Sequence, residues 1–479
     1  MLRIIASFFL SSLYVQISSP AFLAPVVKDL STQKHIMSVY LNTPPQPTNL
    51  LLDLGASATL LKCRARKTNP IAGQPTTRSL SMPVTDGSNP GPLKPIPDFA
   101  FSCGYRSSLK GPMGLAGLGR SNLSIPAQVS TKIRQYCQVF ALCLSGSPSA
   151  PGVAFFGSAG PYNFLPGKVD LSKHLNYTPL VSVRNNPEYF IILKSVLVNG
   201  KAVKVDHHRE HSPELVAMLS TVTPYTVLRT NIFEAVVRAF AEECSSALNL
   251  TAVARAVGPF GLCYEADEVA VGRAGPEVPT VDLVVGGEDS VWRMFGSNSM
   301  VRVYGGEAGE DDVWCMGFVD GGARLGGGAA DVVIGAHQME DSLVEVDLEG
   351  GRLGFSSSVM VQGTMCANFN FTTNDHVLED VSESESLILI ILKKKRRSQR
   401  DVPPRSTSWQ WHGPFGLCYE ANEMAMGRAG PEVPTVDLVV GVGIRCGEYV
   451  VIGAHQMEDS LVEFDMEGGM LGFSSSVMV

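Results

Sequence analysis

The feature that most constrains this chain is a strand-and-turn pattern that occurs twice, far apart in the sequence. Residues 50–57 run from three leucines into Asp53 and then Gly55, which places a carboxylate at the end of an apolar strand and before a glycine turn. Residues 217–228 repeat the pattern, with an apolar strand, the polar pair Ser220 and Thr221, and a short turn before a helix. Together with the length of 479 residues, this predicts at least two globular units.

The chain before residue 372 consists largely of short apolar runs separated by glycine and proline. Residues 36–41, 153–156 and 190–193 are examples, and they are rich in the residue types that favour strands. This region is therefore predicted to be mostly β.

One helix stands out in this β-rich region. Residues 231–244 carry apolar side chains at helical spacing, behind Thr230 and Asn231 as candidate caps. Glu234 follows Asn231 by three residues, which is the spacing of a capping box. We expect the apolar face of this helix to belong to the core.

The first 24 residues are predicted to be a secretory signal peptide. Arg3 gives a positive start, residues 4–15 form an apolar core, and residues 18–21 are small residues of the kind found at cleavage sites. The alternative is a membrane anchor, but that needs roughly 20 apolar residues, more than this run contains. Ten cysteines without a Cys-x-x-Cys pair also indicate an oxidising compartment. A secreted protein without a membrane partner is expected.

Secretion makes asparagine glycosylation a further expectation. Four Asn-x-Ser/Thr sequons are candidate glycan acceptors, at Asn122, Asn176, Asn249 and Asn370. Sequons also arise by chance, so any one of them can remain unused.

Two classes of ligand are not expected. The net charge of −8 argues against a nucleic acid, which needs a concentrated cationic face. Residues 207–211 match a His-x-x-Glu-His zinc pattern, but Ser212 and Pro213 follow directly and predict a loop instead of the helix that zinc binding needs. No metal and no cofactor are predicted.

The C-terminal part of the chain is an internal copy. Residues 258–286 recur as residues 413–441, and residues 332–361 recur as residues 450–479, with three changes in each block. The copy at residues 413–479 lacks the strands that separate the two blocks in the original, so we do not expect it to fold as an independent unit. Residues 373–412, which mix acidic, apolar and basic runs, are predicted to be a linker.

Four segments of this chain resemble the pepsin-like aspartic peptidases. Asp53-Leu54-Gly55 and Ser220-Thr221-Val222 match the family's two Asp-Thr/Ser-Gly triplets, and residues 114–119 and 332–336 match the segments that thread behind them. The resemblance implies a mostly β, bilobal fold with a few short helices, with an N-terminal lobe at residues 25–180 and a C-terminal lobe at residues 181–372.

The closer resemblance is to the plant branch of xylanase inhibitors, endoglucanase inhibitors, extracellular dermal glycoproteins and seed basic globulins. Its signatures are similar to residues 101–104, 116–120, 219–225, 316–322 and 334–338. This similarity ends near Asn370, so residues after 372 are interpreted as an added segment. It implies a monomer in the cell wall or apoplast.

The resemblance also identifies departures from a working peptidase. Hydrolysis by this fold needs two carboxylates that share a proton, and Ser220 stands where the second is expected. Leu54 replaces a bracing hydroxyl residue, and Val222 replaces a glycine. No tyrosine occurs between Cys63 and Phe101, where the family places its flap. Asp53 is therefore interpreted as a structural acid bonded to backbone amides.

The segment after Cys63 is shorter than in the relatives, through degeneration or a lost exon. By resemblance, the expected disulfides are Cys63 with Cys103, Cys263 with Cys315, and Cys143 with Cys366.

The predicted function is that of a secreted, non-catalytic inhibitor that binds a cell-wall-degrading glycoside hydrolase or another secreted protein. Xylanase inhibitors of this branch use a histidine shortly before the last cysteine, and residues 359–365 contain none, so an endoglucanase target or a peptide ligand stays open. The alternatives are an active aspartic endopeptidase that uses Asp53 and a chain that does not fold stably.

Overall fold

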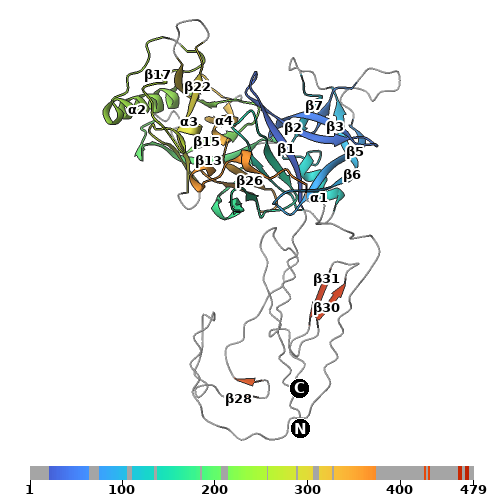
Figure 1. Cartoon of the computed structure of the whole chain (residues 1–479). Coiled ribbons are helices and arrows are strands. Elements are labelled where there is room, and N and C mark those ends of the chain that lie inside the picture. The colour runs from blue at the N-terminus through green and yellow to red at the C-terminus, as the bar shows by residue number, and fades with distance from the viewer. Residues whose placement is uncertain are drawn as a thin grey trace, which may run out of the picture. The chain divides into compact units, whose positions relative to one another are not determined.

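A computed structural model describes residues 21–63, 75–104, 111–133, 137–183, 186–205, 214–255, 257–286, 290–305, 312–325 and 328–373, with four short strands between residues 426 and 473. The chain divides into two compact units, Ser18–Glu379 and a second formed by Met1–Ile17 with Asp380–Val479. The first unit, called the body below, carries both strand-and-turn segments (Figure 1).

The largest element of the body is a 12-stranded sheet. Its order is β12 (Asn176–Pro179), β27 (Arg352–Phe355), β26 (Leu343–Asp347), β8 (Val139–Cys143), β9 (Gly152–Phe156), β1 (Ala21–Asp29), β2 (Lys34–Leu41), β3 (Gln46–Asp53), β7 (Gly114–Gly117), β4 (Leu60–Leu61), β6 (Pro90–Cys103) and β5 (Pro75–Thr85).

A second sheet has eight strands. Its order is β21 (Val291–Met294), β20 (Val281–Val285), β13 (Tyr189–Val198), β15 (Leu215–Leu219), β25 (Val332–Ile334), β16 (Thr226–Leu228) and β24 (Phe318–Asp320), and β14 (Lys201–Ala202) pairs with β13.

Smaller elements complete the body. They are the sheet β17 (Cys263–Glu265), β23 (Val313–Met316) and β22 (Met300–Val303), the hairpins β10 (Asn163–Phe164) with β11 (Val169–Asp170) and β18 (Val271–Gly272) with β19 (Gly275–Pro276), the helices α1 (Ile125–Lys132), α2 (Thr230–Leu248), α3 (Gly296–Ser299) and α4 (Ala336–Met339), and the 3-10 turns η1 (Leu171–His174), η3 (Val359–Gln362) and η4 (Cys366–Asn368).

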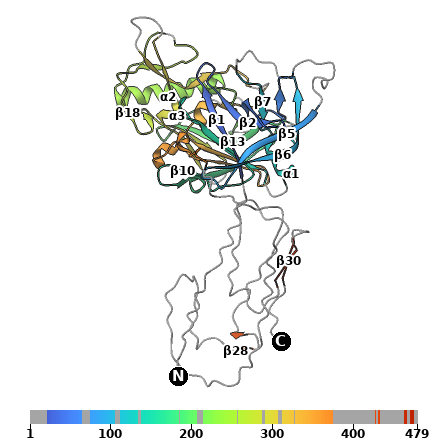
Figure 2. The same cartoon turned by 45° about the vertical axis from the view of Figure 1, so that its right-hand side comes forward.

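The strands form where the sequence alternates or where it is continuously apolar. In β2 the inward residues His35, Met37, Val39 and Leu41 are buried and most of their neighbours are only partly covered, as expected for a strand with one face in the core. In β8, β9 and β26 every residue is buried, so these strands lie in the middle of the structure. In Figure 1 β26 lies between α2 and β5, and in Figure 2 β13 lies between α2 and β6.

The two strand-and-turn segments occupy equivalent places in the two sheets. β7 pairs in parallel with β3, matching Asp53 with Gly117, and β25 pairs in parallel with β15, matching Leu219 with Ile334. β7 then pairs antiparallel with β4, as β25 does with β16. The predicted threading of residues 114–119 and 332–336 behind the two triplets is therefore present in the fold.

The first strand of the body begins before residue 24, the predicted end of the signal peptide. β1 begins at Ala21, and Phe22, Leu23 and Ala24 are buried and pair with β9. Removal of all 24 residues would strip these side chains from the core, so the predicted boundary at residue 24 is not compatible with an intact β1.

The expected capping box of the long helix is wrong. α2 begins at Thr230, its N-cap is Arg229, and no side chain caps its first turn. The Thr230 hydroxyl donates to Asp320, and the Asn231 side chain accepts from Arg229 Nε. The two candidate cap side chains thus bond to a distant aspartate and to a neighbouring arginine instead of to the first turn of the helix. The predicted apolar face is present, with Ile232, Val236, Phe240 and Cys244 buried.

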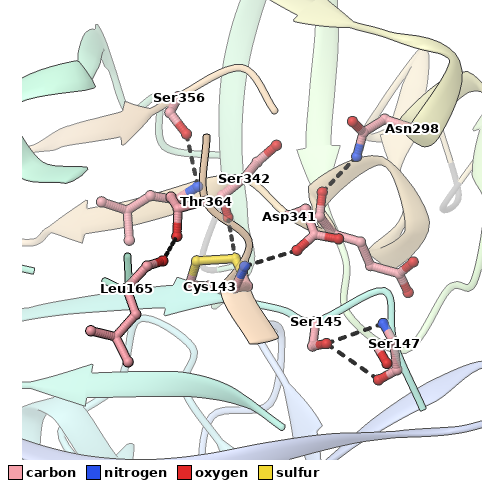
Figure 3. Close-up of a disulfide and its surroundings, with 12 residues drawn as sticks. Cys143, Ser145, Ser147, Leu165, Asn298, Asp341, Ser342, Ser356 and Thr364 are labelled. Atoms are coloured by element: carbon pink, nitrogen blue, oxygen red, sulfur yellow. Dashed lines mark hydrogen bonds between the residues drawn. A yellow bond between two sulfur atoms is a disulfide. The ribbon is translucent and has the colours of Figure 1, made fainter. Parts of the chain in front are cut away.

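Three disulfides connect described residues of the body, and they are the pairs that the resemblance implies: Cys63–Cys103, Cys143–Cys366 and Cys263–Cys315. Figure 3 shows the Cys143–Cys366 bridge, which links β8 to η4 across a sequence separation of 223 residues. The amide of Cys366 also donates to Asp341 Oδ1 at 2.8 Å. The C-terminal segment of the body is thereby held against the large sheet.

The copied residues form two hairpins of their own. β28 (Met426–Gly427) pairs with β29 (Gly430–Pro431), and β30 (Val462–Asp465) pairs with β31 (Met470–Phe473). The pairing registers equal those of β18 with β19 and of β26 with β27. The near-identical sequences thus specify the same local pairing.

Candidate functional site

Asp53 lies at the end of β3, as its sequence pattern predicts. One carboxylate oxygen accepts the amide of Gly55 at 2.8 Å, and the backbone oxygen accepts the amide of Leu118 at 3.0 Å. Burial raises the pKa of Asp53, while hydrogen bonds from the amides of Gly55 and Ala56 and the charge of Lys34 lower it. The carboxylate of Asp53 is thus hydrogen-bonded to the backbone amides of the turn that follows β3.

Ser220 lies at the matching end of β15 and is buried. Its hydroxyl is 2.9 Å from the hydroxyl of Thr223 and accepts the amide of Thr223 at 3.2 Å. Its own amide donates to Ile334 in the threading strand. The Ser220 hydroxyl is therefore hydrogen-bonded to the turn that follows β15.

Thr221 links the two strand-and-turn segments. Its hydroxyl accepts the amide of Leu54 at 3.1 Å and donates to the carbonyl of Leu52 at 2.9 Å. Leu52 and Leu54 flank Asp53, so one threonine holds the backbone on both sides of the acid. Leu54 is buried and offers no hydroxyl for a reciprocal bond, so this bridge runs in one direction only.

Glycines of the threading strands allow the close approach of backbone on which the site depends. A Cβ on Gly117 would lie 2.4 Å from the carbonyl oxygen of Ala58, and one on Gly335 would lie 2.5 Å from that of Tyr225. Both distances are shorter than any contact a side chain tolerates, so glycine is required at these equivalent places.

Sequence reasoning missed Glu188, which precedes β13. A Cβ on Gly55 would lie 3.2 Å from Glu188 Oε1 and 3.5 Å from Asp53 Oδ1, so both carboxylates flank the same glycine. The other oxygen of Glu188 accepts from the Asn186 side chain at 3.0 Å. No described hydrogen bond joins Glu188 to Asp53. The only signal in the sequence is a carboxylate just ahead of an apolar strand, which by itself predicts nothing.

The remaining predicted residues are scattered over the body. Asn122, Asn176 and Asn249 are exposed, and Asn370 is partly exposed. The zinc-like segment at residues 207–211 and the shortened segment at residues 64–74 lie outside the described residues. In the part of the chain that the structure describes, no three side chains are arranged as metal ligands, and no helix is long and apolar enough to cross a bilayer.

Comparisons with known proteins agree with this geometry. Two family models match, xylanase inhibitor N-terminal at residues 67–158 and xylanase inhibitor C-terminal at residues 188–357. The chain is 39% identical over 403 residues to a protein of Glycine max named "Probable aspartic proteinase GIP1", covering 72% of this chain and 91% of that protein. It is 38% identical over 323 residues to gamma conglutin 1 of Prunus dulcis, covering 65% and 70%.

Solved structures give the same result for the fold. The crystal structure titled edgp superposes with a TM-score of 0.65 at 35% identity, and the match covers 74% of this chain and 98% of that chain. Conglutin gamma from lupine seeds superposes with a TM-score of 0.60 at 28% identity, covering 74% and 99%. With its paired threading strands and matching domain models, the chain belongs to the xylanase-inhibitor-type family of pepsin-like proteins.

Proposed function

We propose that this protein is a secreted, non-catalytic binding protein of the plant cell wall or apoplast that inhibits a cell-wall-degrading glycoside hydrolase. The observation that carries the proposal is at Ser220. The fold keeps the paired strands and the Thr221 bridge, but the second acid position holds a hydroxyl that bonds to its own turn. A serine with an ordinary hydroxyl cannot share the proton that peptide hydrolysis by this fold requires.

The binding role is supported by the xylanase-inhibitor descriptions of both matching models. It is also supported by three exposed apolar side chains, Leu165, Val361 and Met365, which are 46%, 42% and 40% exposed and whose two chain segments are joined by the hydrogen bond from Thr364 to Leu165. We call them the tail-loop cluster. Apolar side chains on a fixed backbone lose little ordering entropy on binding, which favours their use in a contact surface.

The backbone under the tail-loop cluster is held from several directions. The Thr364 hydroxyl donates to the carbonyl of Leu165 (Figure 3), and the Leu165 amide donates to the carbonyl of Asn368 at 3.1 Å. The Cys143–Cys366 bridge closes the same segment. The cluster is thus presented on a rigid support, which favours a contact surface.

Two assays test the proposal. The full chain is first incubated at acid pH with a denatured protein substrate, beside an Asp53→Asn variant. We expect no cleavage by either. Cleavage by the parent that Asp53→Asn abolishes would instead support the second candidate, an aspartic endopeptidase acting through Asp53, which the word proteinase in the name of the Glycine max relative favours.

The second assay measures inhibition of a panel of purified secreted xylanases and endoglucanases. A Val361→Asp, Met365→Asp variant is expected to weaken inhibition of the responsive enzyme by about tenfold or more, the range of a hot-spot loss. Val271→Asp is the matched control, since Val271 is equally apolar and 63% exposed elsewhere on the body. Failure to inhibit any member of the panel would count against a glycoside hydrolase target, and equal loss in the control would exclude the tail-loop cluster.

A further inference from the structure

Two aromatic side chains and an arginine form a stack on the small sheet of β17, β23 and β22. Arg302 of β22 lies directly opposite Trp314 of β23, and Tyr304 follows β22. The guanidinium carbon of Arg302 is 5.3 Å from the centroid of the Tyr304 ring and 5.8 Å from that of the Trp314 ring, within the range of cation–π attraction. We call these three side chains the aromatic platform.

The aromatic platform is held in place by polar bonds and a disulfide. Arg302 Nε and Nη2 both donate to Asp312 Oδ2, at 3.2 Å and 2.8 Å. The other carboxylate oxygen of Asp312 accepts the amide of Gly305 at 3.1 Å, which fixes the turn that follows β22. The Cys263–Cys315 disulfide joins β17 to β23. A group that is fixed before its ligand arrives loses little freedom on binding.

Tyr304 is the exposed member of the aromatic platform. It is 71% exposed, and no other large apolar side chain is exposed among the described residues of this sheet. The core of a protein interface usually gathers several apolar side chains, so a single ring among polar groups is a poor centre for one. The arrangement instead favours a ligand that one aromatic ring can hold.

The platform also offers unused hydrogen-bonding groups beside the ring. Among the described residues, neither the Tyr304 hydroxyl nor Arg302 Nη1 makes a hydrogen bond, since the bonds of Arg302 come from Nε and Nη2. A pyranose sugar presents C–H groups on one face and hydroxyl groups around its rim. The electron-rich face of an aromatic ring attracts polarised C–H groups, and the free polar groups can bond to the hydroxyls. The platform therefore matches the chemistry of a sugar ring.

The charges around the platform favour a neutral sugar over an acidic one. Asp312 compensates the positive charge of Arg302. The amide of Ala266 donates to the carbonyl of Asp312 at 2.8 Å, and the exposed acids Asp267 and Glu268 follow directly in the chain. These acids repel a ligand that carries carboxylate groups.

We propose that the aromatic platform is a binding site for a neutral chain of pyranose sugars. One sugar ring packs against the open face of Tyr304, and Arg302 Nη1 donates to the hydroxyl groups of the chain. The site shares no residue with the tail-loop cluster and does not depend on the inhibition proposed above.

Isothermal titration of the full chain with xylohexaose and cellohexaose tests the proposal. The parent should bind at least one of the two, and Tyr304→Ala should weaken that binding by about tenfold or more, because it removes the stacking ring. Tyr304→Phe keeps the ring and should keep most of the affinity. Tyr40→Ala is the matched control, since Tyr40 of β2 is 36% exposed on the 12-stranded sheet. Trigalacturonate, the acidic probe, should not bind.

Several results would overturn the assignment. They are a parent that binds neither neutral hexasaccharide, a Tyr304→Ala variant that binds as tightly as the parent, and a preference for trigalacturonate. Binding of a purified hydrolase that needs Tyr304 in the absence of sugar would assign the platform to a protein interface instead. An unchanged thermal midpoint in Tyr304→Ala shows that the loss of binding is not unfolding. Sugar binding without inhibition of any hydrolase would leave this site standing and reject the inhibitor role alone.

Discussion

The hydroxyl groups of Thr221 and Ser220, near Asp53, have different hydrogen-bond partners. The Thr221 hydroxyl satisfies the amide of Leu54 and the carbonyl of Leu52, both in buried backbone. Among the described residues, the Ser220 hydroxyl by contrast bonds to Thr223 within its own turn. The paired strands and the Thr221 bridge are therefore present, and a serine stands at the end of β15 that matches Asp53 at the end of β3.

This distinction predicts the effect of removing the Thr221 hydroxyl. Thr221→Val keeps the shape of the side chain but leaves two buried backbone groups without a partner, so we expect a loss of about 1–3 kcal/mol in the free energy of unfolding. Thr223→Val removes a half-buried hydroxyl beside it and should cost less. Denaturant unfolding of the two variants measures the difference, and equal losses would contradict the bridging role of Thr221.

At the scale of elements, we expect the Cys143–Cys366 disulfide to contribute more to the free energy of unfolding than Cys63–Cys103 does. The first closes a separation of 223 residues and the second a separation of 40 residues. In the chain-entropy model a longer closed loop restricts the unfolded state more, so removing the first bridge should cost about 1–2 kcal/mol more than removing the second. Paired Cys→Ser variants compared by denaturant unfolding check this, and the reverse order would contradict it.

Element-scale predictions from sequence succeeded where local pattern and burial agree. The apolar face of α2 was predictable because Ile232, Val236 and Phe240 recur at helical spacing. Its N-terminus was not, because the Thr230 hydroxyl bonds to Asp320, ninety positions away, instead of capping the first turn. A capping box is a local rule, and a long-range partner overrides it.

At the scale of the whole molecule, acid stability should depend on Glu340. His337, Lys28 and His35 lower its pKa to about 2 from 4.5, although burial, the largest single influence, acts in the opposite direction. A depressed carboxyl pKa contributes stability above pH 4.5 that is lost as the pH falls towards 2. Glu340→Gln should therefore lose about 3 kcal/mol at pH 5 and little at pH 2. Glu234→Gln, an exposed change on α2, is the control for acid unfolding curves, and a loss from Glu340→Gln that does not vary with pH would contradict the linkage.

The sequence by itself determined the strand-rich character and the two strand-and-turn segments, because each depends on short apolar runs, glycines and turns that neighbouring residues specify. Their threading partners were expected only from the family resemblance. Only the tertiary structure decided the Thr221 bridge, the approach of Glu188 to Gly55, and the Lys28–Glu340 ion pair. These contacts join residues separated by as many as 312 positions, as Lys28 and Glu340 are. No local sequence pattern specifies these contacts, because they depend on how distant segments of the chain pack in the finished fold.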